Sequence, residues 1–290
     1  MLNVLVSLTT TSMRINKINK TILSLMSQSY PIHSINLYIS KTPYLIDKGI
    51  QSIPNNLQLL MSVDKRFKIF FVENLGSYRK LLPILKTNWN KDCLILTVDD
   101  DKIYSFDMVE KMINKYIETN GKFIIANRAF IKMNSIIKNI CIDMLDIEPS
   151  LCDKLTNHSK KDSQNLAYEL GKEFDFISIL TFFEGNDGVL YHPKFFSPTV
   201  YNWKLINKIA LTHDDFWFKI CALINGIGVI CINDFNSRNS IQIKGTNISA
   251  LHFNINKGSY DIYFNNIIRW FYKNGHLKKG IDLFKINNNI

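Results

Sequence analysis

Three consecutive aspartates, Asp99-Asp100-Asp101, directly follow the apolar run 93–98. An apolar run of this length predicts a strand buried on both faces, as in a mainly parallel sheet. Open α/β sheets bind ligands at the carboxyl ends of such strands. On an extended backbone Asp99 and Asp101 point the same way, and two converging carboxylates suit Mg²⁺ or Mn²⁺. The alternative is a solvated acidic turn that starts a helix.

Strand-like and helix-like segments alternate along the chain. Strands are expected at 2–8, 35–39, 68–72, 93–98, 123–126 and 228–232, and the apolar pattern also resumes at 176–183. Helices are expected over 15–26, 76–85, 108–117 and 216–224, the last ending at Gly226. A loop containing Pro43 and Pro54 is expected before the third strand. This order predicts an α/β fold with a mainly parallel central sheet and helices on both faces.

The length of 290 residues and the hydrophobic content of 46% suffice for one large α/β domain or two small ones. The absence of a linker favours a single domain over 1–290. The polar, weakly periodic stretch 134–175 is expected to be an insertion or lid. The segment 259–290 is expected to form a basic helical tail, which could lie on an anionic membrane or dock on the domain.

The net charge is +10 and the sequence pI is about 9.2, which suits anionic partners such as nucleotides, nucleic acid or an anionic membrane. Five scattered cysteines show no metal-ligand spacing, so we expect reduced, buried thiols. Neither a signal peptide nor a membrane-spanning run is expected. These features predict a cytoplasmic location, with peripheral contact at the inner face of a membrane as an option.

A turn rich in hydroxyl groups follows the first strand. Ser7, Thr9 and Thr10 could hold a nucleotide, and Arg14 could add a charge-assisted bond to its phosphates. The alternative is ordinary helix capping by Thr or Ser. Further along, Arg79 and Lys80 could pair with the phosphates of a bound nucleotide or with the aspartates. They could also form a solvated basic face.

Three later motifs also carry candidate residues. The run Glu184-Gly185-Asn186-Asp187-Gly188 allows close backbone approach to a ligand, or forms a plain turn. Asp214 and Asp215 head a predicted helix, where one could cap the helix and the other, with Asp215 favoured, could act as a general base. His252 could be a core histidine or could complete a metal site.

In this order, the motifs resemble those of GT-A-type glycosyltransferases, in the broad family-2-like group that includes bacterial capsule and lipopolysaccharide transferases. The exostosin-type transferase domain has a similar triple-Asp site and a later Asp-Asp helix start. The resemblance covers roughly residues 3–253. It is carried by the segments 6–10 with Arg14, 21–25 with Gln28, 98–101, 185–193 and 213–217.

The resemblance implies a GT-A (Rossmann-like) fold, a nucleotide-sugar donor and a saccharide or lipid-linked saccharide acceptor. It implies that Mn²⁺ or Mg²⁺ is held by Asp101, with Asp99 contacting ribose or metal, and that Asp215 or Asp214 serves the acceptor side. The full expectation is a donor site of Ser7, Thr9, Thr10, Arg14, Lys80, Asp99 and Asp100, a substrate site of residues 184–188, and metal ligands Asp99, Asp101 and His252. The chain departs from the group at residues 214–215, where it has Asp-Asp and the group usually has Glu-Asp.

Three other functions are alternatives: a sugar-phosphate nucleotidyltransferase, a basic nucleic-acid-binding protein and an inactive glycosyltransferase-like binding module. A sugar-phosphate nucleotidyltransferase would need a Gly-rich loop with Lys or Arg after the first strand, whereas the turn here is Thr-rich and lacks glycine. A basic nucleic-acid-binding protein would cluster its cations with aromatic side chains on one face, whereas the cations here are dispersed along the chain.

Overall fold

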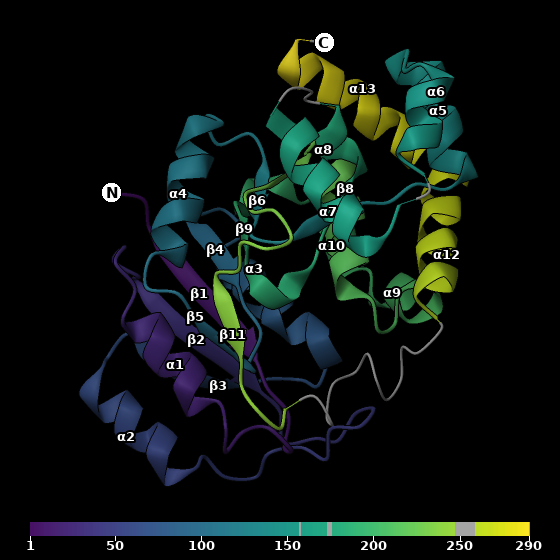
Figure 1. Ribbon diagram of the computed structural model, residues 1–290. Coiled ribbons are helices and arrows are strands. Elements are labelled where there is room, and N and C mark those ends of the chain that lie inside the picture. Colours follow the sequence, from purple (N-terminus) through teal and green to yellow (C-terminus); the bar gives the residue numbers. More distant parts are fainter. Residues whose placement is uncertain (157, 173–175, 247–258, 290) are drawn as a thin grey trace. The chain divides into compact units, whose positions relative to one another are not determined.

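The computed structural model describes residues 1–156, 158–172, 176–246 and 259–289. The architecture is α/β with a mainly parallel sheet (Figure 1). The chain divides into two compact units, each built from three segments. Unit 1 comprises residues 1–114, 185–194 and 239–257, and unit 2 comprises residues 115–184, 195–238 and 258–290. The expectation of a single domain with a lid at 134–175 stays a prediction.

Five strands of unit 1 lie in the order β9-β4-β1-β2-β3 (Figure 1). Their bounds are β1 (Val4–Thr9), β2 (Ser34–Ile39), β3 (Phe67–Phe71), β4 (Leu94–Thr97) and β9 (Val189–Tyr191). The first four run parallel, and β9 is antiparallel to β4. Every residue of β2 and β4 is buried, which explains why these strands are largely apolar in sequence, with only Ser34, Asn36 and Thr97 as polar members. The four strands expected in this part of the chain are confirmed.

One helix of unit 1 corrects a prediction. The region between the second and third strands was expected to be a loop, but α2 (Asn55–Val63) begins directly after Pro54. Leu57 is its one fully buried residue, whereas Leu59 and Val63 are largely exposed. The helical spacing of Leu57, Leu60 and Met61 is present in the sequence, but the exposed Leu59 and Val63 obscure it.

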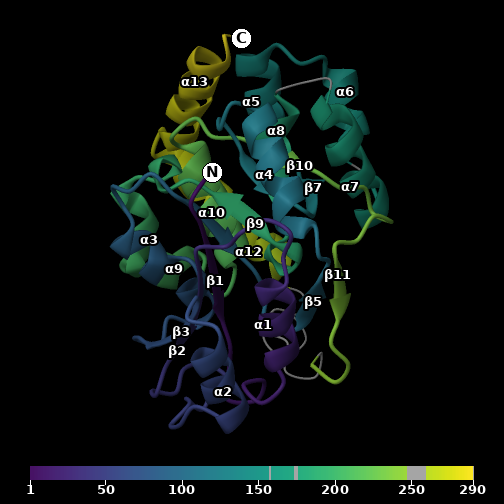
Figure 2. The same cartoon turned by 90° about the vertical axis from the view of Figure 1, so that its left-hand side faces the viewer.

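The other helices of unit 1 follow the sequence pattern. They are α1 (Asn19–Met26), the 3₁₀ helix η1 (Gly76–Lys80) and α3 (Leu82–Thr87), and the boundary between the units falls within α4 (Met108–Glu118). Two three-residue strands, β5 (Lys102–Tyr104) and β11 (Ser240–Gln242), pair antiparallel and lie side by side in both views (Figures 1 and 2). Neither short strand was expected from the sequence.

Unit 2 is mainly helical. It contains the parallel pair β6 (Ile124–Ala126) and β10 (Val229–Cys231), and the antiparallel pair β7 (Ala129–Ile131) and β8 (Thr181–Phe183). The stretch 134–175 forms helices where it is described. The helices of this unit are α5 (Ser135–Leu145), α6 (Pro149–Lys154), α7 (Lys160–Glu169), α8 (Ile177–Leu180), α9 (Trp203–Ile209), α10 (Asp214–Leu223), α12 (Tyr260–Lys273) and α13 (His276–Asn288).

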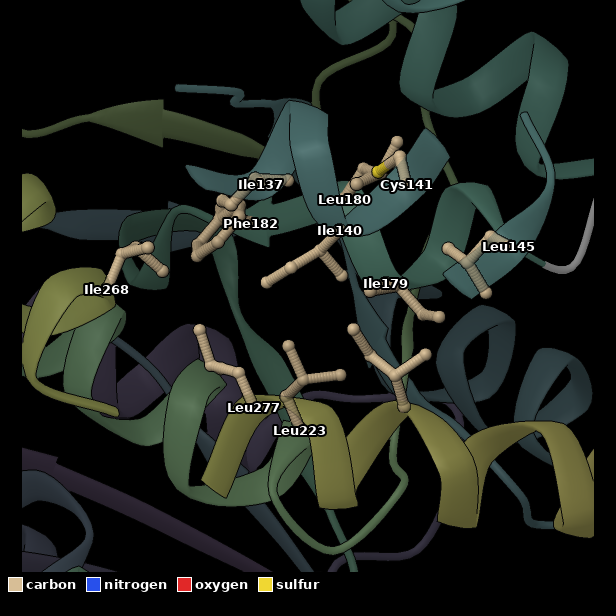
Figure 3. A pocket seen from close by; sticks show the side chains of 11 residues that line it. Ile137, Ile140, Cys141, Leu145, Ile179, Leu180, Phe182, Leu223, Ile268 and Leu277 are labelled. Carbon is tan, nitrogen blue, oxygen red and sulfur yellow. The ribbon is translucent and has the colours of Figure 1, made fainter. Parts of the chain in front are cut away.

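The core of unit 2 is closely packed. Side chains of α5, α8, α10, α12 and α13, among them Ile140, Cys141 and Leu223, surround an apolar cavity of about 20 Å³ (Figure 3). The cavity has room for about one water molecule but offers it no polar partners. All five cysteines are buried and unpaired, and burial raises the pKa of Cys141 to about 12. They are therefore unreactive thiols of the core.

One buried cation lies in this core. Lys219 of α10 is fully buried, and its Nζ donates a hydrogen bond of 2.9 Å to the carbonyl of Ser178. The same atom lies 5.8 Å from the ring centroid of Phe182. Burial lowers the pKa of Lys219 from 10.5 to about 7.

Replacing Lys219 with Met is expected to stabilise the protein by about 2 kcal/mol at pH 7, because it removes a poorly solvated ammonium group and keeps its volume. Between the folded pKa of about 7 and the unfolded value of 10.5 the unfolded chain binds more protons, so wild-type stability rises with pH. The gain should therefore shrink toward pH 10. Urea unfolding at several pH values tests this, with the exposed Lys161→Met as control. A pH-independent loss of stability would contradict it.

Candidate functional site

The aspartate triplet follows β4 at the carboxyl edge of the unit 1 sheet. The backbone turns at Asp100 and Asp101, so the extended backbone expected through the triplet is not present, and the convergence of Asp99 and Asp101 stays a prediction. Asp100 and Asp101 instead face one cation: Nη1 of Arg14 lies 2.7 Å from Oδ1 of Asp100 and 3.1 Å from Oδ2 of Asp101. Oδ1 of Asp99 lies 3.8 Å from Nζ of Lys80.

The three carboxylates therefore differ in their surroundings. Asp100 is buried, with one oxygen bonded to Arg14 and the other accepting a hydrogen bond of 2.5 Å from the hydroxyl of Thr10. Burial raises the pKa of Asp100, and the charge of Arg14 opposes that shift. The Asp99 side chain is 35% exposed, compared with 6% for Asp100 and 11% for Asp101. Asp100 is thus engaged inside the protein, and Asp99 is the most accessible of the three.

The backbone of the triplet is held from several elements of unit 1. The hydroxyl of Tyr104 in β5 accepts a hydrogen bond from the Asp99 amide at 2.9 Å. Thr21 of α1 donates to the Asp100 carbonyl at 3.0 Å, and the amide of Ile243 donates to the Asp101 carbonyl at 2.8 Å. These bonds fix the turn, as a preorganised ligand site requires.

The turn after β1 supports the triplet. Ser7 is fully buried and donates to the Lys80 carbonyl at 2.6 Å, and Thr9 donates to the Tyr38 carbonyl at 2.7 Å. Arg14 also donates to the Thr246 carbonyl at 3.1 Å. The structure thus brings together the predicted residues Thr10, Arg14, Lys80 and the aspartates, but Arg14 bonds to the carboxylates. Its expected contact with phosphate stays a prediction.

A second ion pair was not anticipated. Arg79 is 1% exposed, and its Nη2 lies 3.1 Å from Oδ2 of Asp47 and 3.2 Å from the Thr10 carbonyl. Asp47 also accepts hydrogen bonds from the amides of Ser12 and Gly49. Burial lowers the pKa of Arg79, and Asp47 opposes that shift. No acceptor among the described residues bonds to the buried Nη1 of Arg79.

The glycine-containing run divides between the units. In unit 1, Gly188 has φ of 104°, a conformation that favours glycine. Asp187 is buried, accepts a hydrogen bond from the hydroxyl of Ser240, and lies 3.7 Å from Nζ of Lys102. The Asn186 carbonyl lies 3.1 Å from the Tyr104 hydroxyl. These predicted substrate residues thus support the same turn as Asp99. Gly185 opens the 3₁₀ helix that contains Asn186 and Asp187.

The remaining predicted residues lie in unit 2 or outside the description. Asp214 and Asp215 occupy the first turn of α10, whose N-cap is His213, so neither aspartate is the cap. Burial raises the pKa of the Tyr260 hydroxyl, and the negative charges of Glu184, Asp215 and Asp261 add to the shift. Glu184 also pairs with Arg128 and Lys160. His252 lies outside the described residues.

The carboxylates of this site can be compared with the ligands that a divalent metal ion requires. In the described ranges, no group of three or more His, Cys, Asp or Glu side chains could hold a metal by itself. Asp99 and Asp101 offer hard oxygen ligands, and Mg²⁺ commonly binds through one or two carboxylates together with substrate phosphates and water. The residues therefore fit an ion that is held jointly with an anionic substrate.

Comparisons with known proteins were made for the whole chain. No family model and no curated protein matches it. The mannosyltransferase PcManGT from Pyrobaculum calidifontis, in complex with GDP-Man and Mn²⁺, aligns with a TM-score of 0.44 and 10% identity over 79% of this chain and 54% of its own. S. aureus TarS 1–349, in complex with UDP, aligns with a TM-score of 0.42 and 13% identity over 80% of this chain and 59% of its own. The chain thus spans less than two thirds of either structure.

None of the helices in the described part of the chain is long and apolar enough to cross a membrane.

Proposed function

We propose that this protein is a metal-dependent glycosyltransferase, which moves a sugar from a nucleotide-sugar donor to a saccharide or lipid-linked saccharide acceptor. The observation that carries the proposal is the fixed acidic turn at the carboxyl edge of the unit 1 sheet, flanked by Arg14 and Lys80. Ligands of open α/β sheets bind at this edge. The resemblance of the sequence motifs to GT-A-type enzymes supports the same reaction.

In this proposal Asp99 and Asp101 hold Mn²⁺ or Mg²⁺. When bound, the ion supplies Lewis-acid stabilisation of the charge on the leaving nucleoside diphosphate. Lys80 lies close enough to Asp99 to contact the same diphosphate. Arg14 and Thr10 hold Asp100, and through it the turn, in one geometry.

We also propose that Asp215, or its neighbour Asp214, serves the acceptor side. If the reaction inverts the anomeric centre, this carboxylate removes the proton from the attacking hydroxyl. If the reaction retains the configuration of the anomeric centre, no such base is needed. Residues 184–188 contribute to substrate binding, with Glu184 contacting the substrate directly and Asp187 stabilising the turn from within. We place the enzyme in the cytoplasm.

A panel of UDP-, GDP- and CMP-sugars tests the proposal. We expect one donor to be hydrolysed slowly without acceptor in the presence of Mn²⁺, and EDTA to remove that activity. Nucleotide binding is measured in parallel by calorimetry, with and without Mn²⁺. If no nucleotide binds under either condition, the donor site is assigned wrongly. Turnover that persists in EDTA would contradict the role of the metal.

A further inference from the structure

The last two helices of unit 2 carry a concentration of exposed positive charge. α12 and α13 are joined by Asn274 and Gly275, and both pack into the unit through buried side chains such as Phe271 and Phe284. Four exposed cations lie close to this junction, two at the end of α12 and two at the start of α13. We call this group the basic corner; it consists of Arg269, Lys273, Lys278 and Lys279.

Helix stability explains only part of the basic corner, because Lys273 stands in the last turn of α12, where a cation is favourable, whereas the two lysines of α13 do not. Lys278 and Lys279 stand in the first turn of α13, which contains no acidic residue. The helix N-terminus is itself positive, so cations there are unfavourable. The two helices contain two acids: Asp261 is paired with Lys132 at 2.6 Å, and the exposed Asp282 stands one turn after Lys278 and Lys279. The four cations of the corner therefore face one nearby acid. The surface therefore keeps an excess of positive charge, which complements an anionic partner.

Exposed apolar side chains accompany these cations. Helical periodicity places Ile262 on the same stripe of α12 as Arg269, two turns away, and Ile286 on the same stripe of α13 as Lys279, also two turns away. Ile262 is 60% exposed and Ile286 is 71% exposed. Cations beside exposed apolar side chains are typical of helices that lie in a membrane interface. Trp270 is half-buried, and its ring stacks on that of His276 at a centroid distance of 5.7 Å. Tryptophan is also common at membrane interfaces.

We infer that the basic corner, together with Ile262 and Ile286, binds the surface of an anionic phospholipid bilayer. Nucleic acid would use the same cations but would gain little from exposed isoleucines, so the apolar pair favours a bilayer. This binding is independent of the proposed sugar transfer, since it needs neither donor nor acceptor. Failure of one proposal therefore leaves the other standing.

Sedimentation of the full chain with lipid vesicles tests the inference. We expect binding to vesicles of phosphatidylcholine mixed with phosphatidylglycerol, weakening with added salt, and little binding to phosphatidylcholine alone. Each cation near an anionic surface contributes roughly a fivefold increase in binding. Reversing all four cations should therefore lower binding by more than about 100-fold. The variant is Arg269→Glu/Lys273→Glu/Lys278→Glu/Lys279→Glu, which should fold because Glu favours the first turn of α13.

The matched control reverses four exposed lysines of unit 1, with the same change in net charge: Lys65→Glu/Lys68→Glu/Lys86→Glu/Lys91→Glu. It should retain most of the binding. The double variant Ile262→Ser/Ile286→Ser should bind the anionic vesicles about tenfold more weakly than the wild type. An equal loss in both charge variants would overturn the inference in favour of bulk charge. Absence of vesicle binding would also overturn it, and so would binding of a single-stranded oligonucleotide in its place.

Discussion

Replacing Asp101 with Asn is expected to reduce turnover by about 10³-fold or more and to leave the fold intact. In the proposed mechanism the substitution removes one ligand charge from the metal, whose stabilisation of the leaving group contributes several kcal/mol. It changes the side-chain volume very little, and the bond from the Ile243 amide to the Asp101 carbonyl is unaffected. Initial rates over a Mn²⁺ titration measure the effect, and circular dichroism checks the fold.

Asp107→Asn is the matched control for this experiment. Asp107 also lies in unit 1 and has a cationic partner, Lys111 at 2.8 Å, but its side chain is 44% exposed. That variant should keep wild-type activity. Full activity of Asp101→Asn would refute the metal assignment, and a loss of folded protein would show that Asp101 is needed chiefly as the partner of Arg14.

Replacing Asp215 with Ala is expected to slow sugar transfer by about 10²- to 10⁴-fold, the usual contribution of a general base, while nucleotide affinity stays nearly unchanged. The measurements are the transfer rate to acceptor and the dissociation constant of the nucleoside diphosphate. Asp214→Asn is the neighbouring comparison, because Asp214 lies in the same helical turn but is buried. A large loss of donor binding in Asp215→Ala would move this residue to the donor side. An unchanged transfer rate would exclude it as the base.

Burial explains which strands could be predicted from the sequence. β1, β2 and β4 are enclosed by other chain segments, so their apolar runs are nearly unbroken. β5 and β11 were missed because three residues carry no usable pattern, and their pairing joins segments far apart in the chain. α2 was missed because its outward face carries Leu59 and Val63 where polar residues are usual.

The candidate site was predictable in its residues but only partly in its geometry. The acidic triplet and the Thr-rich turn were visible because charged and hydroxyl groups follow apolar strands. The turn at Asp100 was not visible, because it depends on tertiary bonds from Thr10 and Thr21. Asp47 was missed for the same reason: nothing in its local sequence marks it, and its role follows from contact with Arg79.

The three-segment construction of unit 1 bears on how the site is made during synthesis. The contacts that hold the triplet and its neighbours include Ser240, Ile243 and Thr246, all from the third segment. A nascent chain that has released only its first 114 residues from the ribosome already contains Asp99 to Asp101 but lacks these bonds. The proposed donor site is therefore completed late in translation, after most of unit 2 has emerged.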